Sequence, residues 1–326
     1  MSIISNCTAT AIKDAAAALI KGDLVAFPTE TVYGLGADAT SKEAVGRIYE
    51  VKSRPVGHPV IVHILSVGNI HNWARDIPEY AIKLANFFWP GPMTLILPRT
   101  DLAKDFITGG QDNVGIRVPS HTVALALLKE FEDQGGLGIA APSANRFGAV
   151  SPTTASAVEI ELADFLSESD QILDGGSCAI GVESTIIDCT QDKPLILRPG
   201  AITKEMIEAA LCITINVSIS STKSKQIKAS GLLESHYSPK AKVFLTGSPT
   251  LGDGLIALDS FSTPKGVIRL AIPKDNEDYA RLLYEAFRLA DNKGVKRIFV
   301  IPPIGDGIAV AINDRLAKSA SNFEHT

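Results

Sequence analysis

The chain has 326 residues, of which 45% are hydrophobic and 21% are charged. This length is sufficient for two domains with hydrophobic cores, and the composition excludes a disordered chain. The formal net charge of −5 argues against a general nucleic-acid binder, because sequence-independent affinity comes from lysine and arginine that meet phosphates. A small anion held in one local basic pocket remains compatible with this charge.

The pattern of cysteines and the length of the apolar runs indicate the cellular compartment of the protein. Cys7, Cys178, Cys189 and Cys212 are scattered, with no C-x-x-C pair and no ligand-like histidine spacing. A zinc site or a disulfide framework is therefore not predicted. The N-terminus lacks the basic region and the apolar core of a signal peptide, and no run reaches the roughly 18 apolar residues of a membrane span. We expect a cytoplasmic protein with no membrane partner.

Strands and helices alternate along the first part of the chain. The predicted elements are a helix over 8–21, a strand over 24–27, a helix from a capping box at 40–43 to the residue before Pro55, and strands over 60–65 and 94–97. The alternation continues to about Leu197. This pattern is typical of an open α/β sheet.

The composition changes after that region. Residues 213–235 begin as a strand and become a stretch rich in serine, threonine and lysine without periodicity, which predicts a linker. Strands over 242–245, 254–258, 267–272 and 297–301 follow, with helices over 278–292 and 308–320. These elements predict a small second α/β domain.

Two glycine patterns suggest dinucleotide binding but do not support it. Gly34–Ala39 and Gly252–Ala257 both fit G-x-G-x-x-A, yet the chain has 26 glycines and such matches arise by chance. The first pattern follows a polar segment and not the end of a strand, and no G-x-x-x-x-G-K-[ST] occurs. We therefore predict neither a dinucleotide fold nor a P-loop.

A basic cluster stands out in the acidic chain. Lys52, Arg54, His58 and His63 lie within twelve positions. Lys52 falls in the last turn of a predicted helix, where the helix dipole favours a cation by roughly 0.3–1 kcal/mol, so it needs no functional explanation. Arg54 at the helix end and His63 within an apolar strand have no such explanation.

Further polar residues follow or interrupt predicted strands. Arg117 and Arg198 end apolar strands before a proline, and each is either the partner of a buried carboxylate or a ligand clamp. Ser143 and Asn145 lie in a loop after a buried strand, where α/β proteins bind ligands. Ser151, followed by Pro152, predicts a helix start; the local pattern favours a plain N-cap over a phosphate site.

Covalent and metal-centred catalysis find no support in the sequence. There is no G-x-S-x-G, no cysteine in a nucleophile context and no H-x-x-x-H. The sequence therefore predicts no metal ligated by the protein.

Ordered segments carry a family resemblance across nearly the whole chain. They are FPTETVYGLGADA, KSRPVGHPVIVH, WPGPMTLIL, VGIRVPSH, APSAN with GAVSPTTA, GVESTIID, ILRPGAIT and, near the linker, HYSPKAKV. In this order they resemble the YrdC-like threonylcarbamoyl-AMP synthases in their long, two-domain form. The resemblance implies an open twisted mixed sheet with a large central cavity, followed by a small Rossmann-like α/β domain.

The resemblance also implies a reaction. The family combines L-threonine, bicarbonate or CO2, and ATP with Mg²⁺ into L-threonylcarbamoyl-AMP and pyrophosphate, without an organic cofactor. A tRNA threonylcarbamoyl transferase complex then modifies adenosine 37 of tRNA. Mg²⁺ is expected through the ATP phosphates. A role as an RNA-binding or ribosome-maturation module is the alternative, and the acidic composition argues against strong direct nucleic-acid binding.

Site residues follow from the matched segments. Lys52 and Arg54 are expected at the reacting phosphates as the catalytic pair. The other residues expected at ATP are His58, Asn113, Ser143, Asn145, Ser151, Arg198 and Tyr237. Those expected at threonine are Thr31, His63, Arg117, Ala141 and Ser184.

The resemblance divides the chain into a catalytic domain over 1–212, a linker or lid with the HYSP segment over 213–240 and a C-terminal domain over 241–326. One departure lies just before His236. The family usually has basic residues there, whereas this chain has Leu232-Leu233-Glu234-Ser235. This difference predicts a smaller contribution of the lid to the site than in the family.

Overall fold

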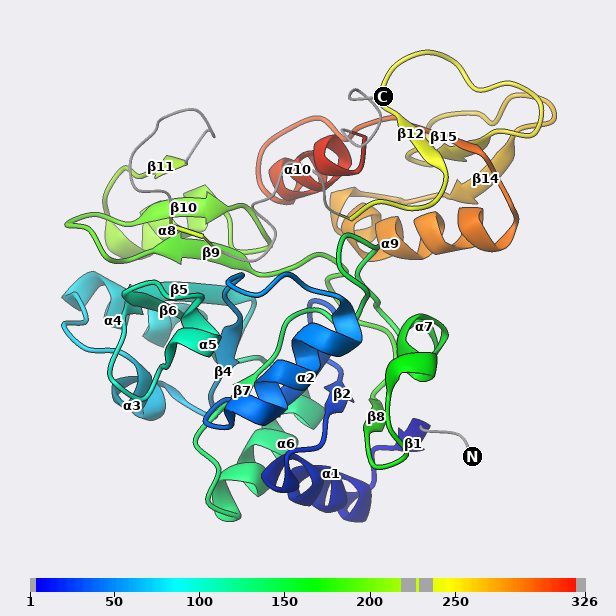
Figure 1. Cartoon of the computed structure of the whole chain (residues 1–326). Coiled ribbons are helices and arrows are strands. Elements are labelled where there is room, and N and C mark those ends of the chain that lie inside the picture. The colour runs from blue at the N-terminus through cyan, green and yellow to red at the C-terminus, as the bar shows by residue number, and fades with distance from the viewer. Residues whose placement is uncertain (1–3, 218–226, 229–236, 321–326) are drawn as a thin grey trace.

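The computed structural model of the chain describes residues 4–217, 227–228 and 237–320. Within them the chain forms two sheets with helices around them (Figure 1). The larger sheet is mixed, with the order β1-β8-β2-β3-β7-β4-β6-β5-β9-β10-β11, and the smaller is parallel, with the order β12-β15-β13-β14. The mixed α/β class predicted from the sequence is confirmed.

Strands of the larger sheet are short and mostly buried. They are β1 (Ile4–Asn6), β2 (Val25–Phe27), β3 (Gly34–Asp38), β4 (Ile61–His63), β5 (Met93–Pro98), β6 (Asn113–Arg117), β7 (Ile139–Ala140), β8 (Gln171–Asp174), β9 (Thr185–Asp188), β10 (Leu195–Arg198) and β11 (Asn216–Val217). The smaller sheet contains β12 (Lys242–Phe244), β13 (Gly254–Ile256), β14 (Ile268–Ala271) and β15 (Arg297–Val300).

Helices cover both sheets. Those of the first unit are α1 (Ala9–Lys21), α2 (Lys42–Lys52), α3 (Ile70–Trp73), α4 (Glu79–Phe88), α5 (Asp105–Thr108), α6 (Thr122–Asp133), α7 (Ala155–Leu162) and α8 (Lys204–Leu211), with single 3₁₀ turns over Val67–Asn69 and Ala163–Phe165. The second unit has α9 (Asn276–Asn292) and α10 (Ile308–Ala320). Helix α1 packs against α6, and α4 packs against α8. Among the described residues no helix is long and apolar enough to cross a membrane.

Helix ends follow capping chemistry, although two predicted caps are wrong. Helix α2 is capped by Ser41, whose hydroxyl accepts from the Ala44 amide, and Thr40 instead bonds Asp38, so the predicted box at 40–43 is off by one residue. Helix α7 begins after Thr154 and not at Ser151. Ser151 does not cap this helix, and its hydroxyl donates to Glu183 instead.

Gly34 and Gly36 belong to strand β3 and do not form a phosphate loop. A Cβ at Gly36 would lie 2.8 Å from atoms of both Phe27 and Ile139. The glycine is therefore required by close packing between neighbouring strands. This explains the first G-x-G-x-x-A match without a dinucleotide.

Register in the larger sheet brings distant polar residues together. Strands β4 and β6 are parallel, and His63 pairs with Arg117 across them. Strand β7 runs antiparallel to β4 on its other side, and the Ala141 amide donates to the Ile61 carbonyl, so residues 141–145 leave the sheet beside Ile61. Sheet pairing therefore gathers residues from three separate segments at one edge.

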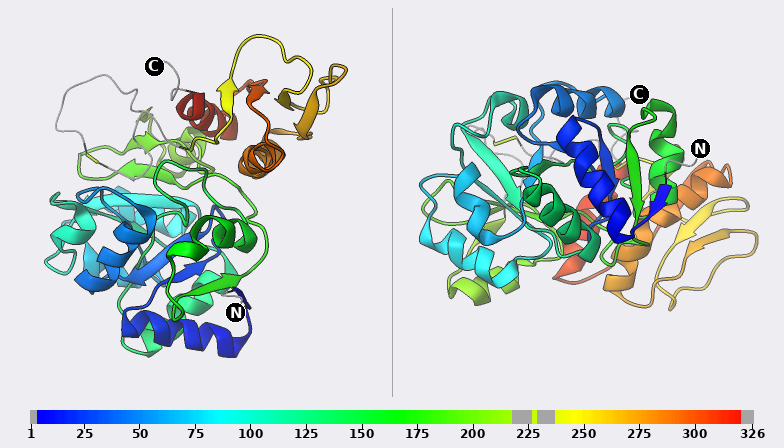
Figure 2. Two further views of the ribbon diagram at one scale, coloured as in Figure 1. Left: turned by 45° about the vertical axis from the view of Figure 1, so that its right-hand side comes forward. Right: turned by 90° about the horizontal axis from the view of Figure 1, so that it is seen from below.

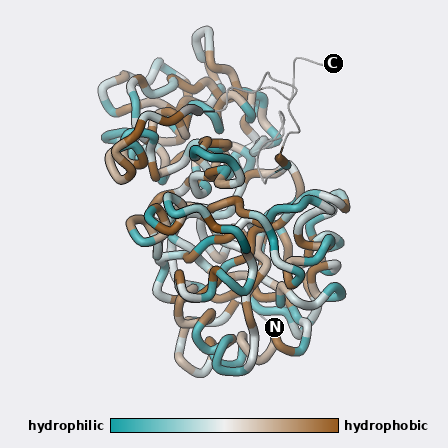
Figure 3. The backbone as a smooth tube through the Cα atoms, turned by 90° about the vertical axis from the view of Figure 1, so that its left-hand side faces the viewer, coloured by the Kyte–Doolittle hydropathy of each residue, from teal (hydrophilic) through white to brown (hydrophobic). Residues whose placement is uncertain are grey.

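The second unit docks on this polar edge. Its hydrophobic core includes Tyr284 and Phe287 of α9 and Ile312 of α10, and the same cluster takes in Val150 and Val182 of the first unit. Figures 1 and 2 show α9 and α10 between the smaller sheet and the loops around β9 and β10. Colouring by hydropathy shows hydrophobic segments running through both lobes (Figure 3). The two units thus share a buried boundary.

Candidate active site

A pocket that is partly open to solvent lies where the strands of the larger sheet end. Its lining comes from the loop between β2 and β3, strands β4, β6 and β10, the loops at 141–143 and 183–184, and two residues outside the sheet. The lining residues are Thr29, Thr31, Val32, Tyr33, Gly34, Arg54, Ile61, His63, Arg117, Ala141, Pro142, Ser143, Glu183, Ser184, Arg198 and Tyr237.

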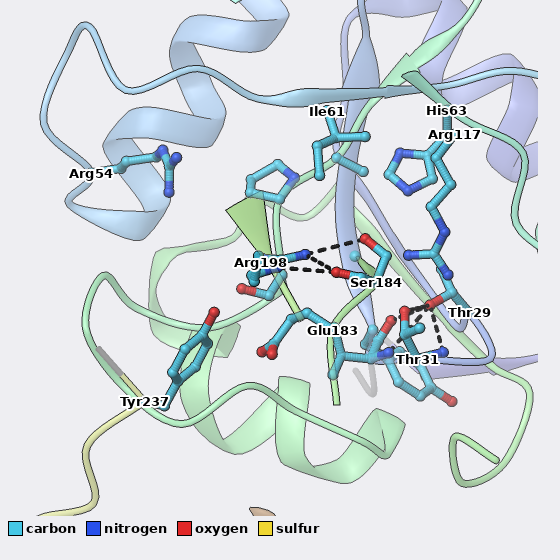
Figure 4. A pocket seen from close by; sticks show the side chains of 16 residues that line it. Thr29, Thr31, Arg54, Ile61, His63, Arg117, Glu183, Ser184, Arg198 and Tyr237 are labelled. Atoms are coloured by element: carbon cyan, nitrogen blue, oxygen red, sulfur yellow. Dashed lines mark hydrogen bonds between the residues drawn. The ribbon is translucent and has the colours of Figure 1, made fainter. Parts of the chain in front are cut away.

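The pocket has two ends that differ in character. In Figure 4, His63, Arg117 and the Thr29–Thr31 turn lie at one end, and Arg54 and Tyr237 lie at the other. Arg198, Ser184 and Glu183 lie between them. Three arginines and one glutamate line the pocket, so it is suited to an anionic ligand.

Arg117 forms a buried ion pair at the first end. Its Nη2 donates to Glu30 Oε1 over 2.6 Å and its Nε to the Gly91 carbonyl, while the other Glu30 oxygen accepts from the Ser120 amide. Burial alone would raise the pKa of Glu30, but the adjacent Arg117 charge and the hydrogen bonds to the carboxylate together lower that pKa. Among the described residues Nη1 of Arg117 donates no hydrogen bond and remains available to a ligand.

His63 is neutral in this environment. Its side chain is buried edge-on against Phe27, and burial together with the nearby Arg117 charge lowers the pKa of His63 to about 3. Within the described residues its Nδ1 has no hydrogen-bond partner. A histidine with so low a pKa is neutral near pH 7, where one ring nitrogen can donate a hydrogen bond and the other can accept one.

The Thr29–Thr31 turn presents a hydroxyl acceptor. Thr29 Oγ1 donates to the Val32 carbonyl over 2.6 Å and lies 2.7 Å from Thr31 Oγ1. Because the Thr29 proton is already used, the proton in the second contact comes from Thr31. The lone pairs of Thr31 Oγ1 therefore remain for a donor in the pocket.

Arg198 and Ser184 form the middle of the pocket. Arg198 donates through Nε and Nη2 to the Ser184 carbonyl at 3.0 and 2.9 Å, and through Nη2 to the Ser184 hydroxyl at 3.1 Å. That hydroxyl is also 2.8 Å from Thr94 Oγ1 on strand β5. The guanidinium is thereby fixed with little freedom to move.

Arg54 occupies the other end. It is buried after helix α2, where its Nη2 donates to the Pro59 carbonyl over 2.9 Å and its guanidinium lies 5.8 Å from the Phe147 ring. His58 packs edge-on against the same ring and does not line the pocket. Phe147 therefore links Arg54 and His58.

Lys52 lies behind the pocket and not in its lining. Its Nζ donates to the carbonyls of Ser143 and Asn145, and the side chain is 1% exposed. Burial, with a smaller effect from Arg54, lowers the pKa of Lys52 well below its ordinary value. Lys52 thus anchors the loop that carries Ser143.

Nine of the predicted residues line the pocket together. They are Thr31, Arg54, His63, Arg117, Ala141, Ser143, Ser184, Arg198 and Tyr237. Five do not: Lys52, His58, Asn113, Asn145 and Ser151. Asn113 opens strand β6 at the end away from Arg117, and the Asn145 amide donates to the carbonyls of Arg146 and Ala149. Residues 232–236 of the proposed lid lie outside the described part of the chain.

Sequence reasoning missed two carboxylates. Glu30 and Glu183 each lie within a quoted family segment, beside a predicted residue. An acid inside an otherwise buried stretch is a signal for a paired charge, and both are buried here. For Arg117, the alternatives of structural partner and ligand clamp are not exclusive, because it pairs with Glu30 and also lines the pocket.

No group of three or more histidine, cysteine, aspartate or glutamate side chains is placed to hold a metal ion within the described ranges. The two carboxylates nearest the pocket are each engaged by an arginine.

Comparison with known proteins adds family and ligand information. Residues 17–200 match the family model described as "Telomere recombination", with the name Sua5_yciO_yrdC, and residues 202–321 match "Threonylcarbamoyl-AMP synthase, C-terminal domain". Threonylcarbamoyl-AMP synthases of Pyrococcus abyssi and Bacillus subtilis are 39% and 40% identical, each over 95% of this chain and over 94% and 92% of their own lengths.

A solved structure also aligns along nearly the full length. The crystal structure of Pyrococcus abyssi Sua5 complexed with L-threonine matches with a TM-score of 0.88 and 37% identity, covering 98% of both chains.

Proposed function

The chain belongs to the two-domain threonylcarbamoyl-AMP synthases of the Sua5/YrdC family, and from that premise we propose how its pocket binds the substrates. It is a nucleotidyltransferase that uses L-threonine and ATP to form L-threonylcarbamoyl-AMP. We assign one substrate to each end of the pocket because the residues at the two ends differ in chemistry.

Threonine binds at the end that contains Arg117. Nη1 of Arg117 donates to the threonine carboxylate, which joins Glu30 around one guanidinium. Thr31 Oγ1 accepts from the threonine amine or hydroxyl, and neutral His63 provides a second polar contact. Ile61 and Ala141 offer apolar surface for the methyl group.

The ATP phosphates bind between Arg198 and Arg54. Ser143, held by Lys52 behind it, and Ser184 offer further polar contacts, and Tyr237 closes this end of the pocket. Ser184 lies between the two ends, so it contacts threonine on one side. His58, Asn113, Asn145 and Ser151 act around the ATP site without lining the pocket.

This arrangement fits a reaction without a protein nucleophile. The threonine amine adds to CO2 with loss of a proton, or condenses with bicarbonate with loss of water. An oxygen of the resulting N-carboxy group attacks the α-phosphorus, and pyrophosphate leaves. The arginines neutralise charge that builds on the phosphates, and the two-ended pocket aligns the reactants. Lys52 contributes through the loop and Arg54 directly.

Several accessory features complete the proposal. Mg²⁺ enters with ATP and neutralises phosphate charge, because the described side chains offer no ligand cluster of their own. Bicarbonate is the carbon source, and the product passes to a tRNA threonylcarbamoyl transferase complex. The free cysteines suit a cytoplasmic enzyme. We assign 1–212 to catalysis, 213–240 to a linker and 241–326 to a C-terminal domain.

The decisive experiment measures pyrophosphate release from ATP in the presence of bicarbonate, with and without L-threonine. We expect release that depends on threonine, and mass spectrometry should identify threonylcarbamoyl-AMP as the product. ATP turnover that is the same with and without threonine would contradict the proposal. An RNA-binding role finds no support in the acidic chain and predicts neither result.

A further inference from the structure

Two side chains of the second unit reach the wall of the pocket from behind. Arg315 on α10 and Tyr284 on α9 are both fully buried. Arg315 Nε donates to Glu183 Oε2 over 2.8 Å, and the Tyr284 hydroxyl donates to the two oxygens of Glu183 at 3.2 and 3.1 Å. Glu183 lines the pocket and belongs to the first unit. One pocket residue is therefore held from the other unit.

The same two side chains contact Tyr237, which also lines the pocket. The rings of Tyr237 and Tyr284 stack with centroids 5.8 Å apart and an interplanar angle of 24°, and the Arg315 guanidinium lies 5.4 Å from the Tyr237 ring centre. Tyr237 has φ 65°, a left-handed backbone conformation that costs a non-glycine residue free energy. Contacts with Tyr284 and Arg315 offset that cost.

Glu183 makes this arrangement sensitive to Arg315. Burial would raise its pKa, but the charges of Arg315 and Arg198, together with hydrogen bonds from Ser151 and Arg315, lower the pKa of Glu183 to about 2. The carboxylate is thus ionised and depends on these arginines. Ser151 completes its hydrogen bonding from the first unit, over 2.6 Å.

We propose that Arg315 and Tyr284 are positioning residues for the ATP end of the pocket, so that ATP binds well only while the second unit is docked. They hold Glu183 and Tyr237 in place. Without Arg315, Glu183 loses its ion pair and Tyr237 loses the guanidinium beside its ring. This inference rests on the proposed function for the location of ATP, and the threonine end should be affected far less.

The test compares four variants of the full chain with the wild type. Arg315→Met removes the cation and keeps a long apolar stem. Tyr284→Phe removes the hydroxyl that reaches Glu183 and keeps the ring on Tyr237. Arg315→Met with Glu183→Gln removes both charges and relieves the unpaired carboxylate. Arg315→Lys is the conservative variant, which retains the charge but lacks the planar fork.

Matched controls exist for both positions. Arg288 on α9 also bridges the two units, through Glu161 and the Val150 carbonyl, without contacting a residue of the pocket lining. Tyr279, also buried on α9, donates its hydroxyl to the Ile301 carbonyl within the second unit. Arg288→Met therefore measures the loss of one contact between the units that does not involve the pocket lining, and Tyr279→Phe measures the loss of one buried hydroxyl.

Steady-state KM values for ATP and threonine, direct binding of a non-hydrolysable ATP analogue and thermal unfolding are the readouts. We expect Arg315→Met to raise the KM for ATP about tenfold or more and that for threonine less than about threefold. Tyr284→Phe should show a smaller change of the same kind, and Arg315→Lys should recover part of the affinity. Both controls should leave each KM within about twofold of the wild type.

The double variant separates positioning from folding. It should unfold at a higher temperature than Arg315→Met, yet its ATP affinity should stay low because Tyr237 has lost the guanidinium. Recovery of ATP affinity together with stability would overturn the inference, as would equal changes in Arg315→Met and Arg288→Met. If Arg315→Met does not fold, Tyr284→Phe and the double variant decide. A wild type without threonine-dependent turnover would instead contradict the proposed function.

Discussion

Arg117 shows how one residue serves both stability and binding. Its guanidinium neutralises the buried Glu30 and still presents Nη1 to the pocket. An arginine can do both because its planar guanidinium carries five N–H donors that point in different directions. A lysine carries its donors on a single nitrogen atom. Arg117 therefore cannot be assigned to structure alone or to binding alone.

Substitution of Arg117 tests this double role. Arg117→Met should lower the free energy of unfolding by roughly 3–5 kcal/mol, because the Glu30 carboxylate stays buried without its partner. It should also abolish threonine binding. Adding Glu30→Gln should restore much of the stability, measured by urea unfolding, but not threonine binding, measured by calorimetry. If the double variant bound threonine normally, the clamp assigned to Arg117 would be wrong.

His63 makes stability depend on pH in a defined window. Its pKa in the folded state is about 3, below the ordinary value of 6.5, so below pH 6.5 the unfolded chain binds a proton that the folded chain does not. Stability should therefore rise with pH, by up to about 1.4 kcal/mol per pH unit from this residue, between about pH 3 and 6.5. His63→Gln should flatten that part of the profile in urea unfolding. An unchanged slope would show that His63 is not buried and neutral.

At the scale of elements, helix α2 and the loop after β7 act as one unit. Lys52 ends the helix and donates to two loop carbonyls, of which that of Ser143 also accepts from the Asn145 amide. The helix therefore fixes the loop that carries Ser143 into the pocket. The helix dipole alone does not account for a lysine that is buried in this way.

Lys52→Met should loosen the loop without unfolding the helix. Removal of the ammonium takes away the donor of the Asn145 carbonyl, which costs roughly 1–3 kcal/mol locally, and leaves the Ser143 carbonyl with the Asn145 amide alone. We expect faster amide hydrogen exchange across residues 141–149 and weaker ATP binding, with threonine binding retained. Lys42→Met, at the exposed start of the same helix, is the control and should change neither. Equal amide hydrogen exchange across residues 141–149 in Lys52→Met and Lys42→Met would contradict the loop-anchoring role of Lys52.

At the scale of the whole molecule, the boundary between the units is close-packed. Gly181 has φ 86°, and a Cβ there would lie 2.5 Å from both the Ala280 carbonyl oxygen and Arg281 Cα of α9. The loop that carries Glu183 into the pocket therefore approaches α9 too closely for any side chain. Docking of the second unit and the shape of the pocket are linked at this point.

Gly181→Ala should weaken docking. Gly176 provides the control, because it has φ 82° but no atom within 4 Å of an added Cβ, so Gly176→Ala introduces backbone strain alone. We expect faster limited proteolysis between the units and a larger radius of gyration by X-ray scattering for Gly181→Ala only. The same behaviour in both variants would mean that strain, and not contact with α9, is responsible.

The sequence by itself determined the elements and most of the pocket. Apolar periodicity is local, so it located helix α10 over its full length and the strands within one to three residues at most ends. The family segments identified nine residues that line the pocket. Arg315 could also have been noticed, because it occupies a buried-face position of α10 between Ile312 and Leu316.

Only the tertiary structure decided which partner each buried charge takes. Glu30 and Arg117 are 87 positions apart, and Glu183 and Arg315 are 132 positions apart in different units. The position of Lys52 behind the pocket, and not in its lining, likewise depends on a loop more than ninety positions away. Local propensity carries no information about such pairs, because they form only when packed strands and docked helices bring the segments together.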